Sequence, residues 1–262
     1  MSTADMALLP ERGILSVTGE DARHFLDNLI TNDMDLLDTQ PAMHAGLLTP
    51  QGKILFAFFV IRQDDGYLIE TSAKAVPELV KRLTMYKLRA KVTITDISSS
   101  RAVAVAWNGE PPTDPHLVAF PDPRQSDLGW RLIMTPDLAG TLTSNKSLEP
   151  DRWHAHRIGL GVPEAEFDYP IGDTFPHEAD FDLFNGVSFT KGCFVGQEVV
   201  ARMQHKTVVR KRVVPVTGAH HLATGTPINV GAAEIGRIGS VAGSNALALL
   251  RLDRVAEAEE KG

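Results

Sequence analysis

Apolar residues along the first hundred positions switch between the spacing of strands and the spacing of helices. Ile14, Leu15 and Val17 form a short apolar run. An apolar stripe at i, i+1, i+4 and i+5 then begins at Phe25, as in a helix with one buried face. Two further apolar runs are separated by a turn that contains Pro and Gly, which suits antiparallel strands. The expected elements are strands at 14–17, 45–48, 53–61, 67–70 and 92–97, and helices at 18–30 and from Pro77 onward.

The order strand, helix, strand, strand, strand, helix, strand predicts an α+β layer. In such a layer, helices cover one face of a mainly antiparallel sheet. Thr18 is the expected cap of the first helix, with Asp21 three positions on as in a capping box. The pattern does not favour a doubly wound parallel sheet.

The second half of the chain has a different pattern. Five prolines between 108 and 124 predict a loop or an insertion at a subdomain edge. A short amphipathic helix follows Pro150, and glycines near 160 are expected to end it. From Lys211 onward, expected strands at 212–216, 228–230, 235–241 and 246–251, separated by glycine-rich turns, predict a small all-β module. The charged end, 253–262, is expected to fray.

Composition and charge narrow the protein class. A length of 262 residues with 43% hydrophobic content is enough for one large or two modest domains. The apolar runs are too short to span a membrane and the N-terminus has no basic leader, so we expect a soluble protein. A net charge of −7 argues against a protein whose main function is to bind nucleic acid. Cys193 is the one cysteine in the sequence, which excludes an internal disulfide and predicts a reducing, cytoplasmic location.

The densest chemical motif is Lys-Gly-Cys-Phe-Val-Gly-Gln-Glu at 191–198. Its two glycines allow a sharp turn and a close backbone approach. Cys193 precedes an expected helix N-terminus and follows Lys191 by two positions, and both neighbours favour a reactive thiolate. The alternative is a small buried cysteine that fills a turn. The residues by themselves leave these two interpretations open.

Other candidate sites are weaker. The histidines at 154, 156, 220 and 221 lack the spacing of a zinc site, so no metal site is expected from this chain. Trp153 and Arg157 could flank an aromatic, anionic ligand by stacking and ion pairing, or Trp153 could be core. Five basic residues within 202–212 are typical of a solvated face, or of an RNA contact if a patch forms in space.

The 191–198 motif matches the signature K-G-C-[FY]-x-G-Q-E of the YgfZ family of folate-binding proteins. These proteins are relatives of the glycine-cleavage T protein, an aminomethyltransferase. The segments at 17–33 and 46–53 also resemble the family's N-terminal segment and first hairpin. Segments 86–92 and 153–163 follow in the expected order, so the resemblance covers the chain up to about Arg212.

The resemblance implies two ferredoxin-like, aminomethyltransferase-type folate-binding subdomains over 1–207 and a C-terminal β-barrel over 208–262. It also implies tetrahydrofolate or a folate derivative in a central cavity between them. The implied role is iron–sulfur cluster assembly or repair with iron–sulfur proteins as partners and, through iron–sulfur enzymes, tRNA modification, with a possible tRNA contact. The candidate catalytic residues are Cys193 and Lys191. The candidate folate-binding residues are Trp153, Arg157, Glu178, Gln197 and Glu198.

Two departures from the family pattern bear on activity. Leu55 and Phe56 stand where aminomethyltransferases carry an acidic pair, so proton handling in aminomethyl transfer loses its obvious agent. We therefore expect no glycine-cleavage activity. Arg12 and Gly13 stand near the place of an upstream family tryptophan, which predicts a different folate pose. A tetrahydrofolate-dependent one-carbon transferase remains the enzyme alternative, and an RNA-associated adaptor remains a third.

Overall fold

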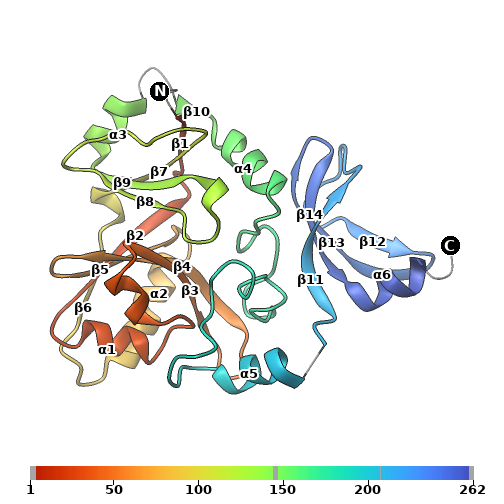
Figure 1. Cartoon of the computed structure of the whole chain (residues 1–262), viewed down its shortest axis with the longest axis horizontal. Coiled ribbons are helices and arrows are strands. Elements are labelled where there is room, and N and C mark those ends of the chain that lie inside the picture. Colours follow the sequence, from red (N-terminus) through yellow and green to blue (C-terminus); the bar gives the residue numbers. More distant parts are fainter. Residues whose placement is uncertain (1–3, 144–146, 207, 260–262) are drawn as a thin grey trace.

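The computed structural model describes residues 4–143, 147–206 and 208–259, which form three β-sheets with helices around and between them (Figure 1). The first sheet has the order β3-β4-β5-β2-β6, and its neighbouring strands are antiparallel throughout. Its strands are β2 (Arg12–Thr18), β3 (Ala42–Leu48), β4 (Ile54–Gln63), β5 (Gly66–Ser72) and β6 (Thr93–Asp96). Its helices are α1 (Ala22–Asp27), the 3-10 helix η1 (Met34–Asp38) and α2 (Val76–Lys87).

The predicted α+β layer is confirmed. Apolar residues of both α-helices, such as Phe25 and Leu79, join strand residues such as Leu15 and Phe58 in one buried cluster. Pro77 occupies the first turn of α2, as expected. The capping box is wrong, because Asp21 and not Thr18 precedes α1 and makes no capping hydrogen bond to it. The Asp21 carboxylate instead accepts the backbone N–H of Lys91, which ties the start of α1 to the segment before β6.

A second sheet, with the order β10-β1-β7-β9-β8, packs on the face of the first sheet that the helices leave open. Its strands are β1 (Asp5–Leu8), β7 (Ala102–Trp107), β8 (Val118–Pro121), β9 (Trp130–Met134) and the short β10 (Ser147–Leu148). The 3-10 helices η2 (Ser98–Ser100) and η3 (Ser126–Leu128) and helix α3 (Pro136–Thr143) accompany it. The proline-rich segment is therefore not entirely a loop, because β8 lies inside it as an edge strand, where Pro is tolerated.

A third sheet, with the order β11-β14-β13-β12, stands to one side of the other two (Figure 1). Its strands are β11 (Lys211–Thr217), β12 (Pro227–Val230), β13 (Ala233–Ala242) and β14 (Asn245–Arg251). All four were predicted. The expectation that the end of the chain frays is wrong for α6 (Leu252–Glu259), and 260–262 lie outside the described residues. The predicted domain boundary at 207/208 adjoins residue 207, which is also outside them.

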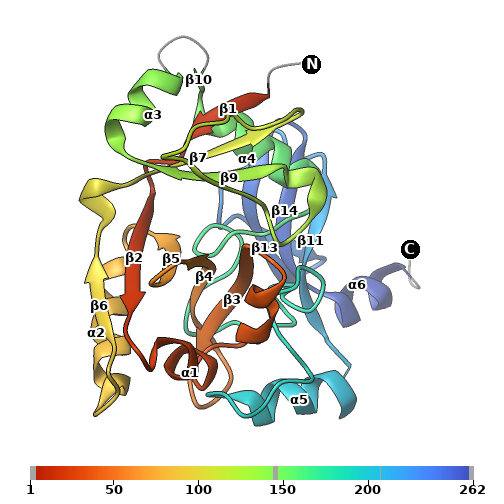
Figure 2. The ribbon, with the colours of Figure 1, turned by 60° about the vertical axis from the view of Figure 1, so that its left-hand side comes forward.

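Helix α4 (Pro150–Gly159) and a long segment without regular structure join the second sheet to α5 (Gln197–Lys206) and the third sheet. Helices α1, α2 and α5 lie at the same end of the molecule (Figure 2). No helix among the described residues has the length and apolar character that crossing a bilayer requires.

Candidate functional site

Cys193 is exposed on the loop that leads into α5. The thiol is therefore reachable from solvent, and the interpretation as a buried turn-filling cysteine is wrong. Helix α5 begins at Gln197, four positions later, so Cys193 is not at the helix N-terminus itself.

Lys191 is the anchor of this loop and points away from solvent, with a side chain 1% exposed. Its ammonium donates to the backbone carbonyls of Asp27, Ile30 and Asn32 at 2.6, 3.2 and 2.8 Å, and lies 3.0 Å from the Asp27 carboxylate. These oxygens belong to the end of α1 and the turn after it, a place that favours a cation. The side chain of Lys191 therefore ties the cysteine loop to α1.

The segment before the motif is held by Thr31 and Asn32, just after α1. The Thr31 hydroxyl donates to the Gly186 carbonyl at 2.6 Å, and its backbone carbonyl accepts the N–H of Ser188. The Asn32 side-chain amide donates to the carbonyls of His44 and Asn185, both at 2.8 Å. Residues about 150 positions apart in sequence thus form one platform under the cysteine loop.

Gly196 fixes the other end of the loop against the β3–β4 turn. It has φ +83°, and a Cβ built on it would lie 2.6 Å from the Thr49 carbonyl oxygen and 3.0 Å from the Gly52 Cα. Only glycine fits such a close approach at positive φ. A Cβ on Gly192 would meet nothing within 4 Å, so the two glycines of the motif have different roles.

Gln197 and Glu198 complete the motif and make contacts within their own segment. The Gln197 amide donates to the Gly192 carbonyl at 3.2 Å and so closes the loop on itself. Glu198 is in the first turn of α5, with a side chain 85% exposed, and pairs with Arg202 one turn later at 2.7 Å. Such a surface pair contributes little to stability.

Two of the remaining candidate ligand residues, Trp153 and Arg157, are buried and contact other parts of the protein. Trp153 is 1% exposed and packs near Trp107 and His156 in the core between the first two sheets. Arg157 pairs with the buried Asp168 at 2.8 Å and donates to the Ser240 hydroxyl of β13 at 2.6 Å.

Glu178 is also engaged locally, since its carboxylate accepts the backbone N–H of Phe175 at 2.9 Å. The five predicted folate-binding residues therefore do not come together around one cavity.

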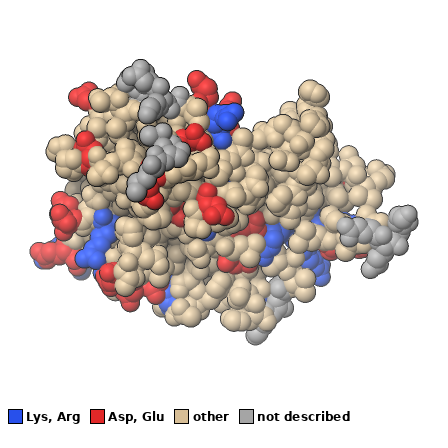
Figure 3. Space-filling view, turned by 45° about the horizontal axis from the view of Figure 1, so that its top comes forward, with Lys and Arg blue, Asp and Glu red and all other residues tan. Residues whose placement is uncertain are grey.

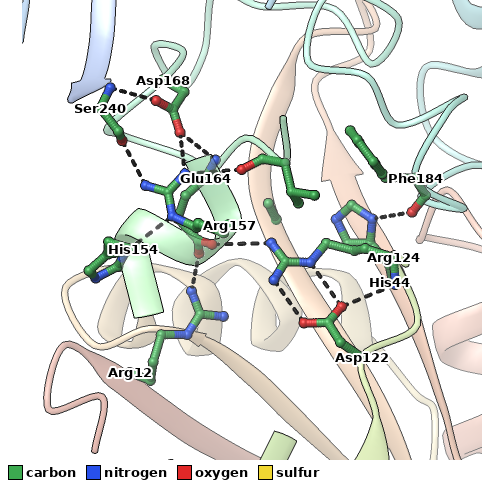
Figure 4. Close-up of polar contacts among 12 residues, drawn as sticks. Arg12, His44, Asp122, Arg124, His154, Arg157, Glu164, Asp168, Phe184 and Ser240 are labelled. Carbon is green, nitrogen blue, oxygen red and sulfur yellow. Dashed lines mark hydrogen bonds and ion pairs between the residues drawn. The ribbon is translucent and has the colours of Figure 1, made fainter. Parts of the chain in front are cut away.

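Six charged side chains form a closed ring where the two N-terminal sheets meet the segment that leads to the third. We call it the charge ring. Figure 4 shows the part of this ring that Arg12, Glu164, Arg124 and Asp122 form. Going round it, the order is Arg12, Glu70, Arg131, Asp122, Arg124, Glu164 and back to Arg12. The six side chains are between 0% and 16% exposed. The guanidinium carbons of the three arginines lie 4.3 to 5.9 Å from the centre of the Phe59 ring, so all three contact the same aromatic side chain.

The ring keeps its carboxylates ionised. Burial alone would raise the pKa values of Glu70, Asp122 and Glu164, but the adjacent arginines outweigh it and hold all three pKa values below their usual range. Among the described residues, the buried side-chain nitrogens and oxygens without a hydrogen-bond partner are Arg82 Nε and His177 Nδ1. Neither belongs to the charge ring, so the ring is satisfied without a ligand.

The charge ring was missed in the sequence. Glu70 and Arg131 each stand inside an apolar strand, which was the available signal, because buried charges require partners. The partners could not be assigned, since Glu70 and Arg131 are 61 positions apart and their strands lie in different sheets.

A cavity of about 570 Å³, which we call the side cavity, opens next to the charge ring, and its size is in the range of small-molecule pockets. Leu55 and Phe56 line it, so the place of the transferases' acidic pair is apolar and faces this space. Arg12 and Glu164 form part of its wall. None of the five predicted folate-binding residues lines it.

A second pocket next to the charge ring is far too small for tetrahydrofolate. Arg12, Phe59, Arg124 and Glu164 are among the residues that line it, and its volume of about 10 Å³ is room for about one water molecule. The residues at this place therefore do not fit a folate.

Two of the five basic residues at 202–212 are paired with carboxylates, and the side chain of Lys206 lies outside the described part of the structure. Arg202 pairs with Glu198, and Arg212 pairs with Asp180 and Asp182 at 2.8 and 2.9 Å. On the face drawn in Figure 3, basic side chains lie scattered among acidic ones. No group of three or more His, Cys, Asp or Glu side chains suited to a metal was found within the described ranges.

Comparison with known proteins identifies the family. Residues 210–261 match the family model for the CAF17 C-terminal beta-barrel domain. The chain is 33% identical to the human protein named iron-sulfur cluster assembly factor IBA57, mitochondrial, over 94% of this chain and 77% of that protein. The chain belongs to the IBA57 family. The predicted membership of an iron–sulfur assembly family is thus confirmed, although the family that the comparison names is IBA57 and not YgfZ.

Fungal members and a solved structure extend this result. IBA57 homologues of Mycosarcoma maydis and Neurospora crassa are 37% and 31% identical over 86% and 81% of this chain. The chain spans only 59% and 53% of their lengths. The glycine cleavage system aminomethyltransferase T of Bartonella henselae matches 96% of this chain and 79% of that chain with a TM-score of 0.73. At 12% identity this likeness shows the fold alone, and it confirms the predicted aminomethyltransferase fold.

The predicted cytoplasmic location is contradicted. The human, mouse and fungal IBA57 relatives are all named as mitochondrial proteins. A single cysteine indicates a reducing compartment, but it does not distinguish one reducing compartment from another.

Proposed function

We propose that this chain acts in iron–sulfur cluster assembly by presenting Cys193 to a cluster that it shares with a partner protein. The observation that carries the proposal is an exposed thiol on a loop that Lys191 and Gly196 fix at both ends. The names of the IBA57 relatives support the same role.

The number of cysteine ligands that a cluster needs shows why a partner protein is required. Biological [2Fe–2S] and [4Fe–4S] clusters are usually held by about four cysteine thiolates, and this sequence has one cysteine. Cys193 can therefore supply one ligand, and an iron–sulfur assembly protein or a recipient enzyme supplies the others. A cluster held between two proteins can pass to whichever of them binds it more strongly. The cluster is the cargo of this process and not a resident cofactor.

Transfer of a one-carbon group is the weaker candidate. Leu55 and Phe56, at the place of the transferases' acidic pair, offer no proton acceptor. The acidic and histidine side chains that line the side cavity stand elsewhere on its wall: Glu11, Glu78, His154, Glu164 and Glu166. Glu164, at its inner end, is paired with Arg12 and Arg124, which hold its pKa low and make it a weak base. Tetrahydrofolate binding stays a prediction from the resemblance, and no step of the proposed function uses it.

The predicted connection to tRNA modification follows from cluster supply to enzymes that modify tRNA. It requires no RNA surface on this chain, and the pairing of Arg202 and Arg212 with acidic side chains agrees with that view. A direct tRNA contact stays a prediction.

Replacing the Cys193 thiol tests the proposed function. Cys193→Ala is expected to abolish maturation of an iron–sulfur enzyme in cells that lack the endogenous factor, while the purified variant keeps the unfolding curve of the wild type. Thr190→Ala, in the same loop and exposed, is the matched control and should rescue maturation fully. Full rescue by Cys193→Ala would rule out the proposed thiol role.

A further inference from the structure

The second half of α2 and the residues that follow it carry positive charge in an acidic chain. Residues 81–91, which we call the basic end of α2, contain five basic residues and no acidic one, whereas the whole chain has a net charge of −7. The five are Lys81, Arg82, Lys87, Arg89 and Lys91. A local excess of positive charge attracts an anionic partner even when the net charge of the protein is negative.

Most of this charge remains available to a partner. Two of the five cations, Lys87 and Arg89, make no ion pair within the part of the chain that the structure describes. The other three pair with Glu78 or Glu20, in contacts of 2.7 to 3.9 Å. The side chains in these pairs are between 34% and 76% exposed, and exposed pairs of this kind are weak.

Two large apolar side chains are exposed in the same segment. Leu88 is 88% exposed and Met85 is 62% exposed. They are three positions apart, so they lie on the same side of the helix end. Leu88 directly follows the last residue of α2 and has φ +45°, which is rare for a residue other than glycine. The segment therefore presents apolar surface and positive charge side by side.

We propose that the basic end of α2 is a contact site for an anionic lipid surface. Lysine and arginine attract the headgroups, while leucine and methionine enter the boundary between headgroups and acyl chains. A nucleic acid would use the cations and leave Met85 and Leu88 in water. A protein would need a pocket shaped for these two side chains, whereas a lipid surface adapts to them. The proposal is independent of the role of Cys193.

Co-sedimentation of the purified full chain with lipid vesicles tests the proposal. Vesicles with about one third phosphatidylglycerol should bind the protein at least about tenfold more strongly than vesicles of pure phosphatidylcholine at low ionic strength. Raising the salt concentration to about 0.3 M should release most of the bound protein, because salt screens the attraction. Equal binding to the two kinds of vesicle, or no binding to the anionic ones, would overturn the proposal.

Two substitutions separate lipid contact from simple anion binding. Leu88→Ser should lower the partition coefficient for the anionic vesicles about tenfold, because it removes apolar surface that enters the lipid. Arg89→Gln should lower it about fivefold through the loss of one charge near the headgroups. Both residues are exposed, so neither change removes a core contact.

Leu183→Ser and Arg152→Gln are the matched controls, since both residues are exposed and belong to other segments. Both controls should bind the anionic vesicles as the wild type does. A Leu88→Ser variant that binds as well as Leu183→Ser would overturn the proposal, even if Arg89→Gln binds weakly, because the contact would then involve charge without lipid insertion.

Discussion

The ammonium of Lys191 lies 3.0 Å from the carboxylate of Asp27, although 164 positions separate the two residues in sequence. This contact joins the cysteine loop to the end of α1 and makes Lys191 a positioning residue. The sequence-based hypothesis that Lys191 assists the thiol directly is replaced by one in which it determines where the thiol is held.

Lys191→Met should therefore destabilise the protein by about 3 kcal/mol, because it leaves several buried oxygen acceptors without a donor. Chemical denaturation monitored by circular dichroism measures this. Lys81→Met is the matched control, since Lys81 is 68% exposed and its pair with Glu78 is at the surface; its effect should stay within about 0.5 kcal/mol. Equal effects of the two changes would contradict the anchoring role.

The two glycines of the motif should respond differently to alanine. Gly196→Ala forces a Cβ to within 2.6 Å of the Thr49 carbonyl oxygen at positive φ and should cost about 2 kcal/mol or more. Gly192→Ala meets open space and should cost less than about 1 kcal/mol. Thermal unfolding and maturation of an iron–sulfur enzyme are the two measurements. A Gly192→Ala variant that is the less stable of the two would disprove the assignment.

The local parts of the fold were predictable from the sequence. Periodicity identified β2 to β6, both helices of the first sheet and the four strands of the third, because each has a regular pattern of apolar and polar positions. The second sheet was missed. Its strands β1, β8 and β10 are short, and β10 joins it through a parallel pair with β1, whereas β7 and β9 are of ordinary length and were overlooked.

The candidate site also has a part that the sequence predicts and a part that it does not. The motif around Cys193 was found because it is contiguous. The partners of Lys191 and the charge ring were not found, because both depend on contacts between residues far apart in sequence. The role of Trp153 illustrates the limit, since an aromatic on a helix has the same pattern whether it contacts a ligand or the core.

Glu70 tests the structural role of the charge ring. Its carboxylate is 0% exposed and receives Arg12 and Arg131, so Glu70→Gln should destabilise the protein by about 3–5 kcal/mol through uncompensated buried charge. Glu198→Gln is the matched control at an 85% exposed position and should be nearly neutral. Urea denaturation of both variants gives the comparison. A small effect at Glu70 would mean that water or local rearrangement compensates the buried charges.

His44 should make stability depend on pH in the mildly acidic range. Burial lowers its pKa from 6.5 to about 4, and the nearby Arg124 acts in the same direction. The ring is also packed near Phe59 and Phe181, and its Nδ1 lies 2.9 Å from the Phe184 carbonyl oxygen. The folded protein therefore keeps this imidazole neutral at a pH where the unfolded chain protonates it.

The direction of the pH dependence follows from the number of protons that the folded and unfolded chains bind. Between pH 6.5 and 4 the unfolded chain binds more protons at His44 than the folded chain, so the free energy of unfolding falls as the pH falls, by up to about 3 kcal/mol across the window. His44→Gln should remove this slope, so the difference between the wild-type and variant curves isolates His44 from the carboxylates that titrate nearby. His205→Gln, at an exposed position, should leave the wild-type slope intact. Parallel curves for wild type and His44→Gln would show that the buried imidazole does not titrate on unfolding.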